Sequence, residues 1–251
     1  MIDTHCHLNL INKDVHEVMA SSEAAGVTHI IQVSIDHQTI LDNLKTYCHL
    51  PNCSVAAGIH PLSVTDSVPF SQSLALMEAH IDSFVAIGEI GLDYKYGTDN
   101  AKEQKAAFVA QLELAHRFNK PVIIHNRQAD ADMLEIVNAY PSIKKVFHCY
   151  ATHIDFFNAL IGAANYVSFT GIITYSKKGK VVRACRDIPL QNMMIETDAP
   201  YILPKGVDAD QNRPEFVVEV VKAMAEIKQV ALEEVIASTT RTAEAFFNIK
   251  E

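Results

Sequence analysis

The chain has 251 residues, of which 49% are hydrophobic and 20% charged, and its formal net charge is −9. This is the composition of an ordinary globular protein and excludes general disorder. The negative charge argues against tight, non-specific DNA binding through many phosphate contacts, although bound metal ions can still attract a transiently held phosphate substrate.

The ends and the cysteines of the sequence bear on its location. The first residues lack the basic start and apolar run of a signal peptide, and no apolar stretch is long enough to cross a bilayer. The five cysteines contain no Cys-x-x-Cys pair, which argues against a disulfide framework and a cysteine zinc site. We therefore expect a cytoplasmic protein with no membrane association and no obligate protein partner.

Short apolar runs alternate with segments of helical periodicity along the whole chain. Strands are predicted at residues 3–7, 29–34, 55–61, 84–89, 121–125, 145–148, 166–170 and 193–198. Helices are predicted at 14–25, 38–48, 74–81, 100–117, 130–139, after 152, and at 214–227 and 232–247. This alternation predicts one α/β domain over residues 1–251 with the (β/α)8 TIM-barrel fold. A doubly wound open sheet is the alternative, but it would usually show a Gly-rich turn where this chain has histidines.

Side chains that suit metal ions follow the predicted strands at their carboxyl ends. His5 and His7 alternate along the first strand, so they share a face and could bind one ion; a buried, hydrogen-bonded pair is the alternative. Later strand ends carry His60, Glu89, His125, His148 and Asp198. Because these ends converge on one mouth of a (β/α)8 barrel, where its active sites lie, we predict a shared metal centre.

This set of residues is sufficient for two divalent ions. Four imidazoles and two carboxylates can hold both ions if one carboxylate bridges, and Glu89 is the candidate because Gly88 and Gly91 leave room beside it. Two such ions would activate a shared water and stabilise a developing oxyanion. Imidazole-rich ligation suits zinc or manganese.

Six ordered motifs are similar to those of a known family. They are DTHCHL at 3–8, GIHP at 58–61, GEIGLDY at 88–94, PVIIHNR at 121–127, HCY at 148–150 and ETDAPY at 196–201. The chain resembles the TatD family of metal-dependent hydrolases, which belongs to the amidohydrolase-type barrels and includes deoxyribonucleases. The similarity extends from residue 2 to about residue 247, essentially the whole chain.

The resemblance implies a role for each ligand. One ion would be held by His5, His7, Glu89 and Asp198, and the second by Glu89, His125 and His148. Asp198 would also receive a proton from the attacking water, so that Asp198 and Glu89 are the expected catalytic residues. The nucleases of this family are regarded as magnesium enzymes, which leaves magnesium, zinc and manganese open as the native metal.

Two residues are our candidates for binding substrate phosphate, His60 and Arg127. The planar fork of Arg127 matches phosphate oxygens and cannot lose its charge; the alternative is a structural salt bridge to Asp130.

The sequence departs from the family pattern at Tyr150-Ala151-Thr152, where Phe, Ser and Gly are usual, and at Thr242, where asparagine is expected. The first departure bears on substrate preference and the second on helix packing.

The leading hypothesis is a metal-dependent phosphodiesterase that removes nucleotides from the ends of weakly bound DNA. The alternative is a hydrolase of small amides, lactones or phosphoesters, which the acidic charge balance and the lack of a basic or aromatic strand track favour. A non-enzymatic metal-binding or scaffold role is disfavoured by the full set of ligands.

Overall fold

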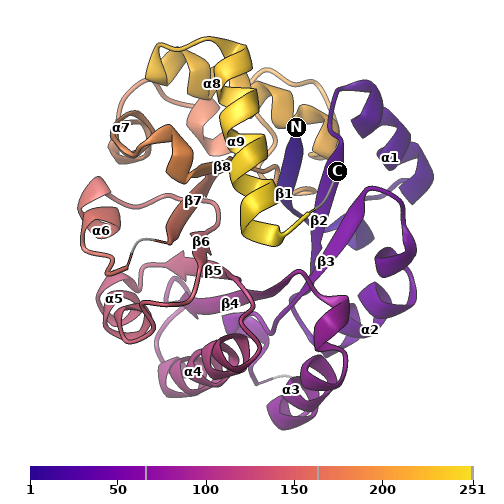
Figure 1. Cartoon of the computed structure of the whole chain (residues 1–251), viewed down its shortest axis with the longest axis vertical. Helices are drawn as coiled ribbons and strands as arrows, with labels where there is room; N and C mark the ends of the chain where they lie inside the picture. Colours follow the sequence, from indigo (N-terminus) through magenta and orange to yellow (C-terminus); the bar gives the residue numbers. More distant parts are fainter. Residues whose placement is uncertain (66, 163, 250–251) are drawn as a thin grey trace. The chain divides into compact units, whose positions relative to one another are not determined.

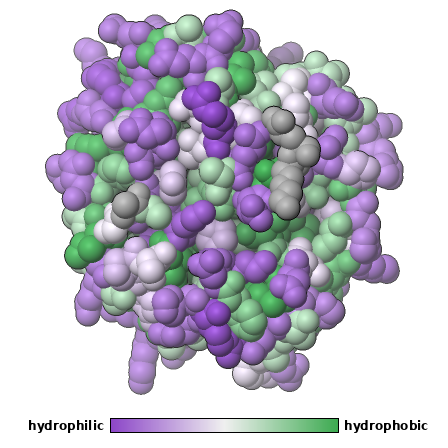
Figure 2. Space-filling view, viewed as in Figure 1, coloured by the Kyte–Doolittle hydropathy of each residue, from purple (hydrophilic) through white to green (hydrophobic). Residues whose placement is uncertain are grey.

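The computed structural model of the chain describes residues 1–65, 67–162 and 164–249, drawn in Figure 1. Within them the chain forms two compact units. The first, here called the terminal unit, comprises Met1–Gln32, Cys149–Asn158 and Tyr166–Glu251. The second, the central unit, comprises Val33–His148 and Ala159–Asn165. Hydrophilic and hydrophobic residues are interspersed on the face shown in Figure 2.

Four strands lie almost entirely in the terminal unit. They are β1 (Ile2–Cys6), β2 (His29–Val33), β7 (Asn165–Phe169) and β8 (Met193–Ile195). The exceptions are Val33 at the end of β2 and Asn165 at the start of β7, which belong to the central unit. β1 pairs in parallel with β2, and β7 with β8. A parallel bridge between Cys6 and Ala199 places the end of β1 beside the segment that follows β8.

The helices of the terminal unit cover the apolar faces of these strands. They are α1 (Val15–Ala24), α6 (Ile154–Asn158), α7 (Lys180–Asp187), α8 (Val217–Lys228) and α9 (Leu232–Phe247), with short 3-10 segments at Leu8–Leu10, Gly171–Thr174, Leu190–Asn192 and Pro214–Phe216. α1 begins where the Asp14 carboxylate accepts hydrogen bonds from the backbone N–H groups of His16 and Glu17. α9 packs against β8 and β1 (Figure 1). Its buried residues include Val235 and Phe247.

The central unit contains the other four strands and the helices that follow them. The strands are β3 (Cys53–Ala57), β4 (Ala86–Asp93), β5 (Val122–Arg127) and β6 (Lys145–Phe147), paired in parallel in that order. The helices are α2 (His37–Lys45), α3 (Phe70–Ala79), α4 (Ala101–Arg117) and α5 (Asp130–Asn138), with 3-10 segments at Tyr47–His49, Pro61–Ser63 and Ile81–Ser83. α4 packs against β4, which is buried at every position, as expected for a covered parallel strand (Figure 1).

Two glycines set how closely β4 approaches its neighbour. A Cβ atom on Gly88 would lie 2.5 Å from the Ile123 Cβ, and one on Gly91 would lie 2.0 Å from the carbonyl oxygen of His125. Gly91 also has a φ of 143°, a conformation that L side chains rarely adopt. These positions are thus filled by the β5 backbone, so the glycines permit close strand contact instead of leaving room beside Glu89.

Within the described residues the eight strands follow one another in the order β1 to β8, the topology of the predicted (β/α)8 fold. Several predicted bounds differ by up to four residues: the strand predicted at 55–61 ends at Ala57, the helix predicted at 74–81 begins at Phe70, and β4 and α7 also differ. β4 continues to Asp93, four residues beyond the predicted end, because Gly91 allows pairing with β5 as far as Asp93 and Arg127. α7 was not predicted, because its buried face is short and lies within a charged run. Among the described residues no helix has the length and apolar character needed to cross a membrane.

Candidate functional site

Three predicted metal ligands meet in the central unit and are here called the central cluster: Glu89 of β4, His125 of β5 and His148, which follows β6. The Glu89 Oε1 atom lies 2.7 Å from His148 Nε2 and 2.8 Å from His125 Nδ1. The two ring nitrogens, His125 Nδ1 and His148 Nε2, are 3.2 Å apart. The Glu89 side chain is 4% exposed, so a buried carboxylate and two imidazoles converge on one point.

The spacing of these atoms fits a metal ion. Ligands at about 2.0 to 2.1 Å from a tetrahedral ion are separated by about 3.3 Å. The separations in the central cluster, 2.7 to 3.2 Å, are slightly shorter, as expected when nitrogens and oxygen approach one another through hydrogen bonds. Nitrogen and carboxylate ligands are also a donor set that divalent transition metals accept. The three residues can therefore hold one ion.

Asp93 orients His125 from the opposite side of its ring. Its Oδ2 atom lies 3.1 Å from His125 Nε2, while its Oδ1 accepts a 2.9 Å hydrogen bond from the Lys95 backbone. When the ring is neutral and its proton lies on Nε2 toward Asp93, the Nδ1 lone pair of His125 is directed at the cluster and can ligate an ion. When the ring is protonated, Nδ1 instead donates a hydrogen bond to Glu89. The sequence analysis gave Asp93 no role, although its even spacing from Glu89, two strand repeats away, was a usable signal.

The charges of the central cluster are mutually dependent. Burial alone would raise the pKa of Glu89, but His148, His60 and the hydrogen bonds from His125 and His148 hold that pKa well below its ordinary value. Burial would lower the pKa of His125, yet hydrogen bonds to Asp93 and Glu89 raise it. Glu89 is therefore an anion that requires a positive partner, supplied either by protonated imidazole or by a metal ion.

His60 lies beside this cluster, and the position of its ring proton disfavours metal ligation. The Leu62 backbone N–H donates a 3.1 Å hydrogen bond to His60 Nδ1. Burial lowers the pKa of His60 to about 4, so the ring is neutral at pH 7 and carries its proton on Nε2, 3.6 Å from Glu89 Oε1. His60 thus presents a hydrogen-bond donor, as a residue that binds substrate oxygen would.

Arg127 ends β5 and is exposed. Its guanidinium carbon lies 5.9 Å from the ring centre of Tyr96. Asp130, the partner in the alternative salt-bridge interpretation, accepts a 2.7 Å hydrogen bond from the Asn126 side chain. Arg127 is thus outside the central cluster and faces solvent from the same strand as His125.

The terminal unit brings together the other three predicted ligands, here called the terminal cluster: His5 of β1, His7 and Asp198. The Nε2 atoms of His5 and His7 are 3.2 Å apart, and they lie 3.7 and 3.5 Å from Asp198 Oδ1. These separations also match the spacing of about 3.3 Å between ligands of one ion. The expected juxtaposition of His5 and His7 is confirmed, although β1 ends at Cys6.

Backbone contacts frame the terminal cluster. The Asp198 N–H donates to the His5 carbonyl at 2.9 Å, and the His7 N–H to the Ala199 carbonyl at 2.8 Å. Asp198 has a φ of 56°, an uncommon conformation that aspartate and asparagine tolerate best. Asp3 accepts hydrogen bonds from the Thr197 hydroxyl at 2.6 Å and its N–H at 2.9 Å, and complete burial raises the pKa of Asp3 to about 7.

The segment with the unusual Tyr150 is fixed by buried contacts in the terminal unit. Glu196 accepts hydrogen bonds from the Cys149 N–H at 2.6 Å and the Ser168 hydroxyl at 2.5 Å. Tyr150 is 2% exposed, with its ring 6.1 Å from Phe169. This departure from the family pattern therefore fills the core. Thr242, the other departure, donates a 2.9 Å hydrogen bond to the Ser238 carbonyl within α9.

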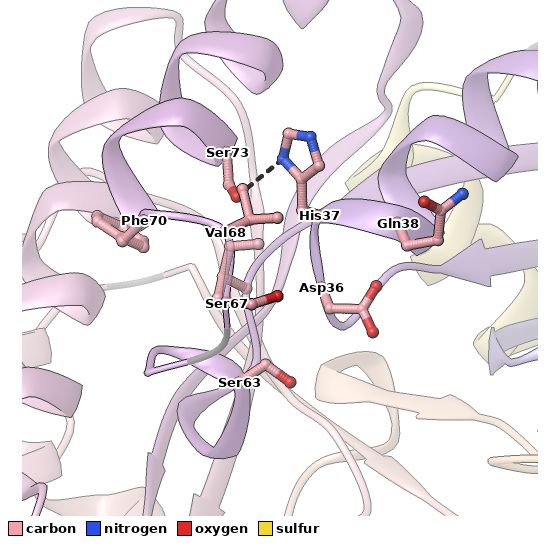
Figure 3. A pocket seen from close by; sticks show the side chains of 9 residues that line it. Asp36, His37, Gln38, Ser63, Ser67, Val68, Phe70 and Ser73 are labelled. Carbon is pink, nitrogen blue, oxygen red and sulfur yellow. Dashed lines mark hydrogen bonds between the residues drawn. The ribbon is translucent and has the colours of Figure 1, made fainter.

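A pocket lies elsewhere in the central unit (Figure 3). It is lined by Asp36, His37, Gln38, Ile59, Ser63, Ser67, Val68, Phe70 and Ser73. The His37 Nδ1 and Ser73 Oγ atoms are 3.0 Å apart, as the dashed line in Figure 3 marks. Its lining residues come from the start of α2, the segment between β3 and α3, and the start of α3. They are too dispersed along the sequence for a sequence pattern to have predicted the pocket.

Parallel strands that alternate with helices, and clusters of histidine and carboxylate at their carboxyl ends, define the chain as a metal-dependent hydrolase of the (β/α)8 class. A family model described as "TatD related DNase" matches residues 2–248. The chain belongs to this family.

Known relatives agree with this assignment. The chain is 31% identical over 256 residues to the uncharacterized metal-dependent hydrolase YcfH of Escherichia coli K12, covering 99% of this chain and 96% of the relative. It is 27% identical over 246 residues to the 3'-5' ssDNA/RNA exonuclease TatD of Escherichia fergusonii, covering 94% of each. The crystal structure of YjjV, a TatD homologue from E. coli K12, superimposes with a TM-score of 0.90 at 24% identity over 100% of this chain and 98% of that one, which confirms the predicted fold.

Proposed function

We propose that this metal-dependent hydrolase is a phosphodiesterase that removes nucleotides from the ends of DNA. The central cluster carries this proposal, because the buried carboxylate of Glu89 on β4 lies between the imidazoles of His125 on β5 and His148 after β6. The same β5 presents the exposed Arg127 two residues beyond His125. A relative named as a 3'-5' ssDNA/RNA exonuclease, alignable over 94% of each chain, supports it.

We further propose two divalent ions, with one ligated in each cluster and magnesium, zinc or manganese as the native metal. The donor sets support this, since histidine nitrogens and carboxylate oxygens suit all three to different degrees. When bound, such ions supply Lewis-acid polarisation of a phosphoryl oxygen and an activated water at neutral pH. The bridging role of Glu89 remains the prediction made from the sequence.

The protein groups have separate tasks in the proposed reaction. Asp198 accepts a proton from the attacking water, a role that a carboxylate can fill when it is ionised. His60 donates its Nε2 proton in a hydrogen bond to a non-bridging phosphate oxygen, because its Nδ1 is already occupied by the Leu62 N–H. Arg127 holds a phosphate of the substrate with its guanidinium fork.

A second candidate function is hydrolysis of small amides, lactones or phosphoesters. The net charge of −9 supports it, because long-range attraction of a polyanion is weak in such a protein.

We also propose a single domain over residues 1–251 and a cytoplasmic location. The free thiols of Cys48 and Cys185 are compatible with a reducing compartment.

One assay separates these functions. The purified, metal-reconstituted protein is tested on single-stranded DNA, on bis(4-nitrophenyl) phosphate and on a panel of lactones and amides, beside Glu89→Gln. We expect turnover of both phosphodiesters by the wild type and loss of both in the variant. Glu78→Gln, which changes an exposed carboxylate paired with Arg117, is the matched control. Lactone or amide turnover without phosphodiester turnover at any metal would overturn the nuclease proposal.

A further inference from the structure

We propose that Tyr96, flanked by Lys95 and Arg127, is a stacking platform for one base of a single-stranded nucleic acid whose phosphodiester lies at the central cluster. The proposal rests on the nuclease function proposed above. The proposed site joins Arg127, already a candidate for binding phosphate, to Tyr96 and Lys95, which had no predicted role.

Tyr96 exposes its ring to solvent to an unusual degree. It is 70% exposed, more than any other large hydrophobic residue among those the structure describes. Nearby Tyr94 differs, because its hydroxyl donates a 2.7 Å hydrogen bond to Asp132. In the described part of the chain Tyr96 has no such bond. A single exposed aromatic residue is common on protein surfaces, so its surroundings decide whether it has a role.

Two cations approach the ring of Tyr96. The Lys95 Nζ atom lies 5.3 Å from the ring centre and the Arg127 guanidinium carbon 5.9 Å from it, both within the range of cation–π interactions. Among the ion pairs of the described residues, neither cation has a carboxylate partner, whereas the neighbouring Lys105 pairs with Asp132 at 2.7 Å. The charge of Arg127 helps to lower the pKa of Asp93, and together with Lys95 it gives the ring of Tyr96 two cationic neighbours in a chain of net charge −9.

The strand register places this group next to the central cluster. On β4 and β5, Gly91 pairs with His125 and Asp93 with Arg127. Residues two apart on a strand share a face and are separated by about 6.6 Å. Arg127 therefore lies one strand repeat beyond His125 on the same face, and the Tyr94 N–H, bonded to the Arg127 carbonyl at 2.9 Å, leads directly into Lys95 and Tyr96.

A single strand of nucleic acid is the occupant that uses all three side chains. The π-face of any base stacks on an aromatic ring, and the adjoining phosphates attract Lys95 and Arg127. Duplex DNA keeps its bases stacked on one another and offers no such face. An acidic peptide would engage the cations but would leave the ring unused, and a small lactone or amide would not extend beyond the cluster.

The test compares two substrates in the metal-reconstituted protein: a single-stranded DNA oligonucleotide and bis(4-nitrophenyl) phosphate, which has no base. For Tyr96→Ala we expect the ratio of kcat/KM for the oligonucleotide to kcat/KM for the small diester to fall about 5- to 150-fold. Tyr96→Phe should keep the wild-type ratio, because stacking needs the ring and not the hydroxyl. Phe118→Ala is the matched control, since Phe118 also lies under an arginine, with Arg117 at 4.9 Å, but follows α4 at the opposite edge of the sheet.

A second readout does not depend on turnover. In the Asp198→Asn background, which should keep the ion of the central cluster, binding of an oligonucleotide with 2-aminopurine near its 3' end should quench the fluorophore, and adding Tyr96→Ala should abolish the quenching. If the wild type cleaves the oligonucleotide and Tyr96→Ala changes neither the ratio nor the quenching, the platform is wrong and the nuclease function stands. If the wild type cleaves the small diester and not the oligonucleotide, it is the nuclease function that fails. An equal loss on both substrates would assign Tyr96 a structural role and overturn the platform.

Discussion

The central and terminal clusters contain the same kinds of side chain but are held in different ways. In the central cluster the carboxylate of Glu89 lies 2.7 and 2.8 Å from its imidazoles, and Asp93 fixes one ring from behind. In the terminal cluster Asp198 lies 3.5 and 3.7 Å from its imidazoles, and backbone hydrogen bonds between β1 and the segment after β8 fix the residues. A side chain, Asp93, thus supports the central cluster, and main-chain hydrogen bonds support the terminal cluster.

This difference has consequences for proton and metal binding. In the central cluster, Glu89 already has positive partners when its imidazoles are protonated, so a metal ion must displace protons to enter. In the terminal cluster the carboxylate of Asp198 is the proposed proton acceptor. The comparison predicts that substitutions in the central cluster mainly change metal affinity, whereas substitution of Asp198 mainly changes the rate of the chemical step.

The largest effect is expected for Glu89→Gln. Activity should fall about a thousandfold or more, because several kcal/mol of transition-state stabilisation depend on the metal centre. Metal content measured by mass spectrometry should fall with it. If only one ion is lost, Glu89 serves the central cluster alone; if both are lost, the predicted bridge is supported. Full metal content with full activity would contradict both assignments.

Asp198→Asn should lower kcat by about a hundredfold to ten-thousandfold, because a neutral amide cannot accept the proton of the attacking water. Asparagine is preferred to alanine for this test since it tolerates the φ of 56° at this position. The ion of the central cluster should be retained, as titration with metal would show. A loss of metal from both clusters with little change in kcat per bound metal would contradict the proposed division of roles.

Asp93→Asn should weaken the affinity of one ion about tenfold to a hundredfold, since an orienting carboxylate behind a ligating histidine has this typical effect. Isothermal titration with zinc or manganese measures it. Asp132→Asn is the matched control, because Asp132 is a nearby carboxylate bonded to Tyr94 and Lys105. Equal weakening in both variants would mean that Asp93 acts through general charge and not through His125.

The smallest effect concerns a buried charge of the central unit that lies outside its cluster. Lys145 at the start of β6 is 1% exposed, and burial lowers the pKa of its ammonium group to about 8. Because the unfolded state keeps its proton to higher pH, the free energy of unfolding of the wild type should rise relative to Lys145→Met by about 1 to 3 kcal/mol between about pH 8 and 10. Urea unfolding across this range measures the difference, with the exposed Lys144→Met as control. A difference that is independent of pH would contradict it.

Much of the fold could be predicted from the sequence because the parallel strands are short apolar runs with distinct ends. The helix at 100–117 was predicted almost to the residue, and its face of Phe108, Leu112 and Ala115 is buried. The strand ends were less certain, because the extension of β4 to Asp93 depends on pairing with β5, a long-range contact made possible by Gly91.

The sequence predicted which residues form each cluster, but it did not predict the neighbouring groups that orient their side chains. His-x-His spacing and strand-end positions sufficed to bring His5 to His7 and Glu89 to His125 and His148. The role of Asp93 and the ring proton of His60 depend on which nitrogen each neighbour contacts, which no sequence pattern encodes. The grouping of Tyr96 with Arg127 likewise arises from the register of two strands.

Gly91 also limits how enzymes built on this framework can diversify in evolution. Any side chain at this position would meet the His125 carbonyl at 2.0 Å, so a mutation there displaces a candidate ligand before it can reshape a substrate site. Changes in substrate range are therefore left to the segments that follow the strands, such as Tyr96 and the residues that line the pocket after β3.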